Sequence, residues 1–215
     1  DSEAYFLQLK EALGQSNTMI SLILVLILMF FNWLTEALKW KLMIARIEKI
    51  SLFRSLEAVC SGLTISIFTP NRIGEYAGRV FHLEKANKIQ ATLITVVENV
   101  SQLIATLLIG SIASIYYFSV FSELSFSLSF LFITILLTVS FISLLGFFNI
   151  RFLENVLLRF RFLKKWQSTF HILSEYSMSE LLKVFSLAVL RYFIFVLQFY
   201  ILIRTRQPCN NKRRV

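Results

Sequence analysis

Residues 69–79 combine cationic, acidic and helix-breaking side chains directly after an apolar run, residues 58–68. Arginine binds phosphate bidentately through its planar guanidinium, so Arg72 and Arg79 together could hold a lipid phosphate or pyrophosphate. The alternative is that both arginines anchor the chain at a membrane surface and that Glu75 is their surface partner. The sequence leaves both interpretations open, but it makes this segment the first candidate for a binding site.

The backbone of the same segment is interrupted where the charges lie. Pro70 stops a preceding helix, and Gly74 and Gly78 permit a close turn and a new helix. A half-helix ending at Pro70, a turn through Asn71 and a helix starting near Gly74 would direct backbone dipoles and guanidinium groups toward one point. We therefore interpret Pro70, Asn71, Gly74 and Gly78 as the structural residues of the turn.

Two further charged residues lie within long apolar runs. Glu98 is eight residues into one run and Arg191 ten residues into another. A charge at such depth costs about 2.5 to 3.5 kcal/mol on insertion scales, so it normally faces a bundle interior and is paired. We expect an arginine of the turn to pair with Glu98, unless Glu98 lies near the membrane surface. Arg191 could line the same cavity or balance a carboxylate, and the candidates for a lipid-headgroup or translocation site are Arg72, Glu75, Arg79, Glu98 and Arg191.

The composition places these residues in a membrane protein. Hydrophobic residues make up 56% of the chain, charged residues only 16%, and the mean hydropathy is +0.68. A spanning helix needs about 20 apolar residues. Four runs meet that length, and we predict an all-α polytopic transmembrane bundle with spans at 19–38, 91–118, 125–148 and 181–203. The run at 58–68 is too short to span, and it predicts a re-entrant helical hairpin over 55–80.

The distribution of lysine and arginine predicts the orientation. Basic residues collect in the segments 39–54, 71–90 and 149–180, whereas 1–18 and 119–124 carry almost none. By the positive-inside rule the first three segments are cytoplasmic, which requires the hairpin to enter and leave on that side. Residues 151–176 predict an amphipathic helix on the cytoplasmic leaflet. The basic tail 204–215 does not fit this topology and is of doubtful native origin, and we expect a plasma or inner cell membrane location.

Other classes of function have little support in the sequence. The net charge of +9 lies beside apolar spans rather than on one face, which favours anionic lipid over nucleic acid. His82 and His171 lack the spacing of metal ligands, and Cys60 and Cys209 indicate no disulfide framework. We therefore expect neither a metal nor a cofactor. At the end of the first span, Trp40 and Lys41 are typical interfacial anchors, whereas Glu36, near Lys39 on one helical face, could belong to a buried pair.

These residues carry a family resemblance. Lys39-Trp40 ends one span, Ser51-Leu52-Phe53-Arg54-Ser55-Leu56 follows, and then come Thr69-Pro70-Asn71-Arg72-Ile73-Gly74-Glu75-Tyr76-Ala77-Gly78-Arg79 and the span with Glu98. Residues 32–110 resemble the lysylphosphatidylglycerol synthase transmembrane family, also called flippase-like membrane proteins. The resemblance implies a further span before Asp1 and more after Ile203, and it makes Pro70, Arg72, Gly74, Glu75 and Arg79 the central turn. Where family members often pair the span's glutamate with an arginine, this chain has Asn99.

Three functions follow as hypotheses. The first is binding of an anionic phospholipid or a polyprenyl-phosphate lipid, with or without its flipping across the membrane. The second is an accessory or scaffold protein that presents polyprenyl-phosphate-linked lipid to a partner glycosyltransferase. The third is an intramembrane enzyme, which Glu75, Glu98 and His82 could serve, but no nucleophile and base with fixed spacing are visible. In synthase members of the family the aminoacyl transfer belongs to a separate soluble domain, so we expect this chain not to be an enzyme.

Overall fold

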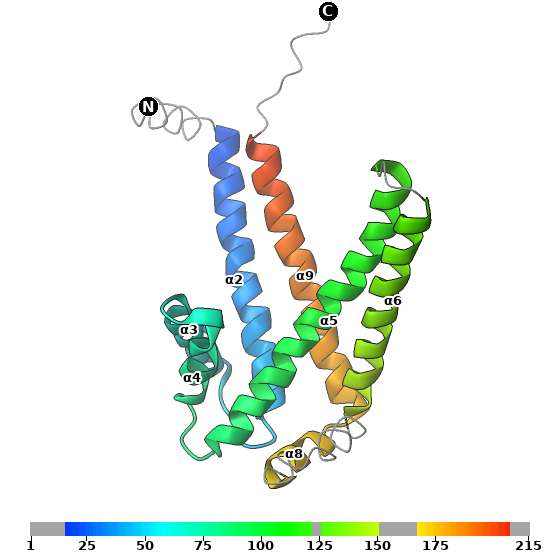
Figure 1. The fold of residues 1–215 in the computed structure, drawn as a ribbon. Helices are drawn as coiled ribbons and strands as arrows, with labels where there is room; N and C mark the ends of the chain where they lie inside the picture. The colour runs from blue at the N-terminus through cyan, green and yellow to red at the C-terminus, as the bar shows by residue number, and fades with distance from the viewer. Residues whose placement is uncertain (1–15, 122–125, 151–166, 207–215) are drawn as a thin grey trace, which may run out of the picture.

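A computed structural model describes residues 16–121, 126–150 and 167–206, and these residues form helices and no strand. The helices pack as a bundle in which both ends of the described chain lie at the same end (Figure 1). In chain order they are α2 (Ser16–Ile44), α3 (Leu52–Ile67), the 3-10 turn η1 (Pro70–Arg72), α4 (Gly74–Val80), α5 (Lys88–Phe121), α6 (Phe126–Phe148), α8 (Gln167–Ser174) and α9 (Met178–Arg206).

Four of the described helices are long and apolar enough to cross a membrane. They contain the segments Thr18–Ile44, Lys88–Phe121, Ser127–Phe148 and Met178–Thr205, whose mean hydropathy lies between 1.9 and 2.5. The chain is therefore an all-α polytopic membrane protein, as the composition predicted. Helices α2, α5 and α9 extend several residues beyond the predicted apolar runs, because polar residues at a membrane surface can continue a helix that hydropathy alone would end.

The long helices pack through a few polar contacts and an apolar core. Helices α2 and α9 lie side by side, and Gln198 Nε2 donates to the carbonyl of Val25 at 3.3 Å. Helix α6 runs antiparallel to α5 (Figure 1), and the hydroxyls of Ser111 and Ser140 lie 2.9 Å apart between them. The buried core gathers at the end of the bundle where α2 ends and α5 and α9 begin; it includes Trp40, Met43, Ile44, Ile94, Leu173, Leu181 and Val184.

Loops rich in basic residues meet at that same end. Glu48, after α2, accepts hydrogen bonds from the backbone N–H groups of residues 84, 85 and 86, at 2.9 to 3.3 Å. Partial burial acts to raise the pKa of Glu48, but these three donors outweigh it and leave the pKa below its ordinary value. Arg46 pairs with Glu180 at 2.5 Å, and the Tyr176 hydroxyl donates to the Met43 carbonyl at 2.6 Å. The basic segments after α2 and before α5 therefore lie together with the start of α9 at one end of the bundle.

Helices α3 and α4 form a short antiparallel hairpin beside the C-terminal half of α2 (Figure 1). The Ser51 side chain caps α3 by accepting from the Arg54 N–H at 3.1 Å. The helices touch at glycines, because a Cβ on Gly78 would lie 2.6 Å from the Gly62 Cα. Their connection passes through η1, and the Gly74 N–H then donates to the Thr69 hydroxyl at 2.8 Å. The hairpin begins and ends at the end of the bundle that carries the basic loops.

Parts of the predicted layout lie outside the described residues. Of the amphipathic helix expected over 151–176, residues 151–166 fall outside them, and α8 covers 167–174 before the chain leaves helical structure ahead of α9. Helix α9 continues to Arg206, and the rest of the predicted tail, 207–215, also lies outside.

Candidate functional site

A cluster of buried charges joins the hairpin to the long helices, and Arg79 of α4 is at its centre. The Arg79 guanidinium contacts Glu36 of α2 at 2.6 Å, Glu98 of α5 at 3.0 Å and also Glu75, one turn earlier on α4. The side chains of Arg79 and Glu98 have no exposed surface. The sequence led us to expect an arginine of the turn as the partner of Glu98, and the structure shows Arg79 in that position.

A second buried cation, Lys39, bridges the same two long helices. Its ammonium lies 2.7 Å from Glu98 and 3.1 Å from Glu36, and it has no exposed surface. From the sequence we placed Lys39 near Glu36 on one helical face but did not count it among the candidate site residues, because a lysine at the end of an apolar run is normally an interfacial anchor. The only available signal was its i,i+3 spacing from Glu36. The anchor interpretation was wrong for the next residue, Trp40, which is fully buried and donates to the Thr95 hydroxyl at 3.1 Å.

Arg191 brings α9 into the same network. Its Nη1 lies 2.7 Å from Glu36, and its Nε donates to the Asn32 amide oxygen at 2.9 Å. Gln102 of α5 lies nearby and donates to the Ala188 carbonyl at 3.2 Å. Unlike Lys39, the Arg191 side chain keeps 23% of its surface exposed. Arg191 is therefore both a partner of the buried cluster and an accessible cation.

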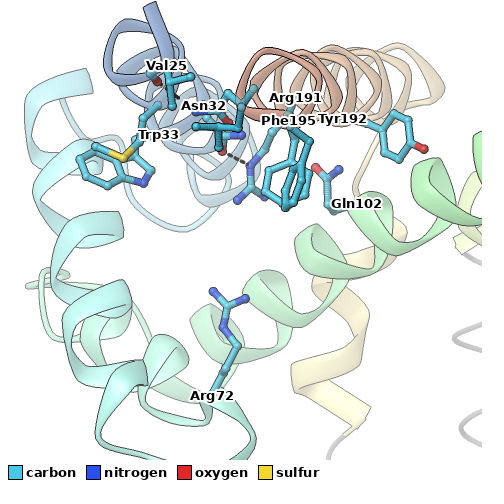
Figure 2. Close-up of a pocket in the computed structure, with 12 residues that line it drawn as sticks. Val25, Asn32, Trp33, Arg72, Gln102, Arg191, Tyr192 and Phe195 are labelled. Carbon is cyan, nitrogen blue, oxygen red and sulfur yellow. Dashed lines mark hydrogen bonds between the residues drawn. The ribbon is translucent and has the colours of Figure 1, made fainter. Parts of the chain in front are cut away.

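Arg72 ends the η1 turn ahead of α4, and its environment differs from that of Arg79. Its side chain is 64% exposed, and the structure pairs it with Glu75 at 3.1 Å. Asn71 and Arg72 both have left-handed backbone, with φ of 53° and 59°. A non-glycine residue in this region costs on the order of 1 kcal/mol or more, and such residues gather at binding sites and switches. From this turn the Arg72 side chain points toward Asn32 and Arg191 (Figure 2), whereas Arg79 is fully buried.

Arg72 and Arg191 reach one pocket from different elements. The pocket has a volume of about 540 Å³. Figure 2 shows Arg72 pointing from the hairpin toward the Asn32 and Arg191 pair. The pocket is polar around Asn32, Gln102 and Arg191 and mostly apolar along α2 and α9. Its lining residues are Val25, Met29, Asn32, Trp33, Arg72, Gln102, Arg191, Tyr192, Phe195, Gln198, Phe199 and Leu202.

The five candidate residues thus have two environments. Arg79 and Glu98 are closed off from the pocket, and Glu75 is nearly buried between Arg79 and Arg72. A buried charge is costly unless it is paired, and each of these carboxylates contacts at least two cations. The buried members hold the hairpin against the bundle, while Arg72 and Arg191 are available to a ligand.

Metal chemistry has no support in the part of the chain that the structure describes. No group of three or more histidine, cysteine and acidic side chains there could hold a metal ion. His82 Nδ1 lies 3.0 Å from the Gly78 carbonyl, a contact that links one turn of the hairpin to the next. His82 thus has a local structural partner.

The fold and the charge cluster define a polytopic helical membrane protein with an ion network inside its bundle. A family model described as the lysylphosphatidylglycerol synthase TM region matches residues 5–206. The chain belongs to this family, which confirms the resemblance seen in residues 32–110. Comparisons with curated proteins and with solved structures gave no match.

Proposed function

We propose that this membrane protein binds a phosphate-bearing lipid in the pocket between the hairpin and α9, and translocates it across the bilayer. The observation that carries the proposal is the mostly apolar pocket, to whose lining the η1 turn contributes Arg72 and α9 contributes Arg191. Guanidinium groups are suited to phosphate oxygens. Membership in the family supports a lipid-related role.

The pocket has the polarity of a lipid. Asn32, Gln102 and Arg191 provide polar groups at one level, and Phe195, Phe199 and Leu202 follow along α9. From Arg191 to Leu202 the helix advances about 16 Å, at about 1.5 Å per residue. That distance is comparable to half the hydrocarbon thickness of a bilayer, about 30 Å in total. A headgroup at the arginines would leave room for acyl chain along α2 and α9.

The position of Arg191 also favours a functional site. It lies near the middle of the Met178–Thr205 span, where an arginine is costly and normally faces a cavity or a partner. Both conditions hold for Arg191, which contacts Glu36 and lines the pocket. A purely structural ion pair would not require an opening beside it.

The hairpin supplies the second half of the proposed path. We infer that the end of the bundle with the basic loops faces the cytoplasm, in a plasma or inner cell membrane, by the positive-inside rule. The hairpin would then be re-entrant from the cytoplasmic side. Its η1 turn would place Arg72 at the pocket, so that movement of the hairpin opens a polar route for the headgroup. The route requires no covalent chemistry, and we propose no catalytic role.

Lipid scrambling in proteoliposomes tests this function. The purified protein would be reconstituted with a fluorescent phospholipid or a polyprenyl-phosphate analogue, and movement between leaflets would be followed by dithionite quenching. Folded Arg72→Gln and Arg191→Gln variants are expected to lose most of the activity. Lys183→Gln removes an exposed cation of α9 outside the pocket and serves as the matched control. Retained lipid binding without any movement would contradict translocation and favour presentation of the lipid to a partner such as a glycosyltransferase.

A further inference from the structure

We propose that the pocket selects a lipid whose headgroup carries one net negative charge, such as a phosphodiester monoanion. This selectivity rests on the lipid site proposed above and adds to it the class of headgroup. It is argued from the balance of charges in the ion network and from the side chains that line the pocket.

The network carries one more cation than carboxylates. Its described carboxylates are Glu36, Glu75 and Glu98, and each is in contact with at least two cations. Its cations are Lys39, Arg72, Arg79 and Arg191. Four positive groups against three negative groups leave a formal charge of +1 in this part of the chain.

The excess charge faces the pocket. Lys39 and Arg79 have no exposed surface, and each lies between Glu36 and Glu98. Arg72 and Arg191 each contact one carboxylate and line the pocket. The cations that are not fully neutralised are therefore those that a ligand can reach.

A single negative charge matches this arrangement best. An uncompensated charge inside a membrane protein is unfavourable, so a monoanion that brings the site to neutrality binds with the least electrostatic penalty. A dianionic phosphomonoester would leave one negative charge in excess. A zwitterionic headgroup would leave the positive charge, and none of the described residues that line the pocket is an aspartate or glutamate that could accept its amine.

Competition binding measures the selectivity directly. The purified protein in detergent micelles would be loaded with a pyrene-labelled phosphatidylglycerol, which is then displaced by unlabelled lipids with matched acyl chains. Phosphatidylglycerol is expected to displace the probe at roughly one tenth of the concentration needed for phosphatidylethanolamine or for phosphatidic acid at mildly alkaline pH, a tenfold ratio equivalent to about 1.4 kcal/mol.

Charge-changing variants separate charge balance from general affinity. Arg72→Gln brings the network to neutrality, and it should remove the preference for phosphatidylglycerol over phosphatidylethanolamine. Glu75→Gln raises the network by one positive charge, and it should shift the preference toward dianionic phosphatidic acid. Lys183→Gln lowers the net charge of the protein by one, as Arg72→Gln does, but Lys183 lies outside the pocket. The selectivity of this variant should match that of the unmodified protein.

Several outcomes would overturn the selectivity. Equal displacement by all three lipids, or an unchanged preference in Arg72→Gln, would show that charge balance does not choose the ligand. Displacement by glycerol phosphate as effective as that by phosphatidylglycerol would indicate a site for free phosphate. Scrambling without charge preference would keep the proposed function and refute the selectivity, whereas selective binding without scrambling would do the reverse.

Discussion

Replacement of Arg79 tests whether the buried ion network holds the hairpin in place. Arg79→Met removes a cation that contacts three carboxylates, from α2, α4 and α5. Removing one partner of a buried ion pair costs roughly 3 to 5 kcal/mol. Every one of these carboxylates keeps another cation, because Lys39, Arg72 and Arg191 remain. We therefore expect a loss at the lower end, about 3 kcal/mol.

The measurement is the free energy of unfolding in mixed micelles, followed by circular dichroism. Arg72→Gln is the comparison, because its side chain is 64% exposed and an exposed pair contributes about 0 to 1 kcal/mol. Adding Glu98→Gln to Arg79→Met should recover part of the loss, since the double variant no longer leaves that carboxylate without its arginine. The ion network does not hold the hairpin in place if Arg79→Met is no more destabilising than Arg72→Gln, or if Arg79→Met leaves hydrogen exchange in α3 and α4 unchanged.

Three other predictions follow from the packing around the site. In thermal unfolding, Gly78→Ala should destabilise the protein by about 1 to 3 kcal/mol, because the added Cβ would lie 2.6 Å from the Gly62 Cα. Gly110→Ala is the control and should be neutral or stabilising, because a Cβ there would have nothing within 4 Å. Glu48 has a lowered pKa, so its contribution to stability is present at neutral pH and should be lost as the pH falls through that pKa. In a plot of unfolding free energy against pH, Glu48→Gln should flatten the acidic part of the curve, and an unchanged slope would contradict this role. Trp40→Phe should cost about 1 kcal/mol for the lost hydrogen bond to α5, and no change in chemical denaturation would show that the bond is dispensable.

Much of the fold follows from local patterns in the sequence. Hydropathy identified the helices that can span a membrane, because each contains a long, strongly apolar run in which charged residues are few. The predicted span in α2 ended too early, because Lys39 and Trp40 look like surface residues in the sequence but are buried in the core. An apolar run in the sequence does not reveal that a lysine at its end pairs with a buried glutamate on another helix.

The site was harder to predict because its contacts join distant segments. The spacing of Arg72 and Arg79 suggested a shared ligand, yet the left-handed backbone at Asn71 and Arg72 sends the two side chains to different surroundings. The contact between Glu36 and Arg191 joins α2 to α9, and no local pattern specifies such a pairing. Depth in an apolar run was the useful signal, since it selected Glu98 and Arg191 before their partners were known.

Photo-crosslinking tests most directly whether a lipid occupies the pocket. A phosphatidylglycerol with a diazirine in its acyl chain would be irradiated with the protein in nanodiscs, and the labelled residues identified by mass spectrometry. A lipid in the pocket should label Phe195, Phe199 or Leu202, and this labelling should decline strongly in Arg191→Gln. Labelling of Leu197, an exposed residue of α9 outside the pocket, should stay constant. Equal labelling of Leu197 and the pocket residues, unaffected by Arg191→Gln, would contradict the presence of a lipid in the pocket.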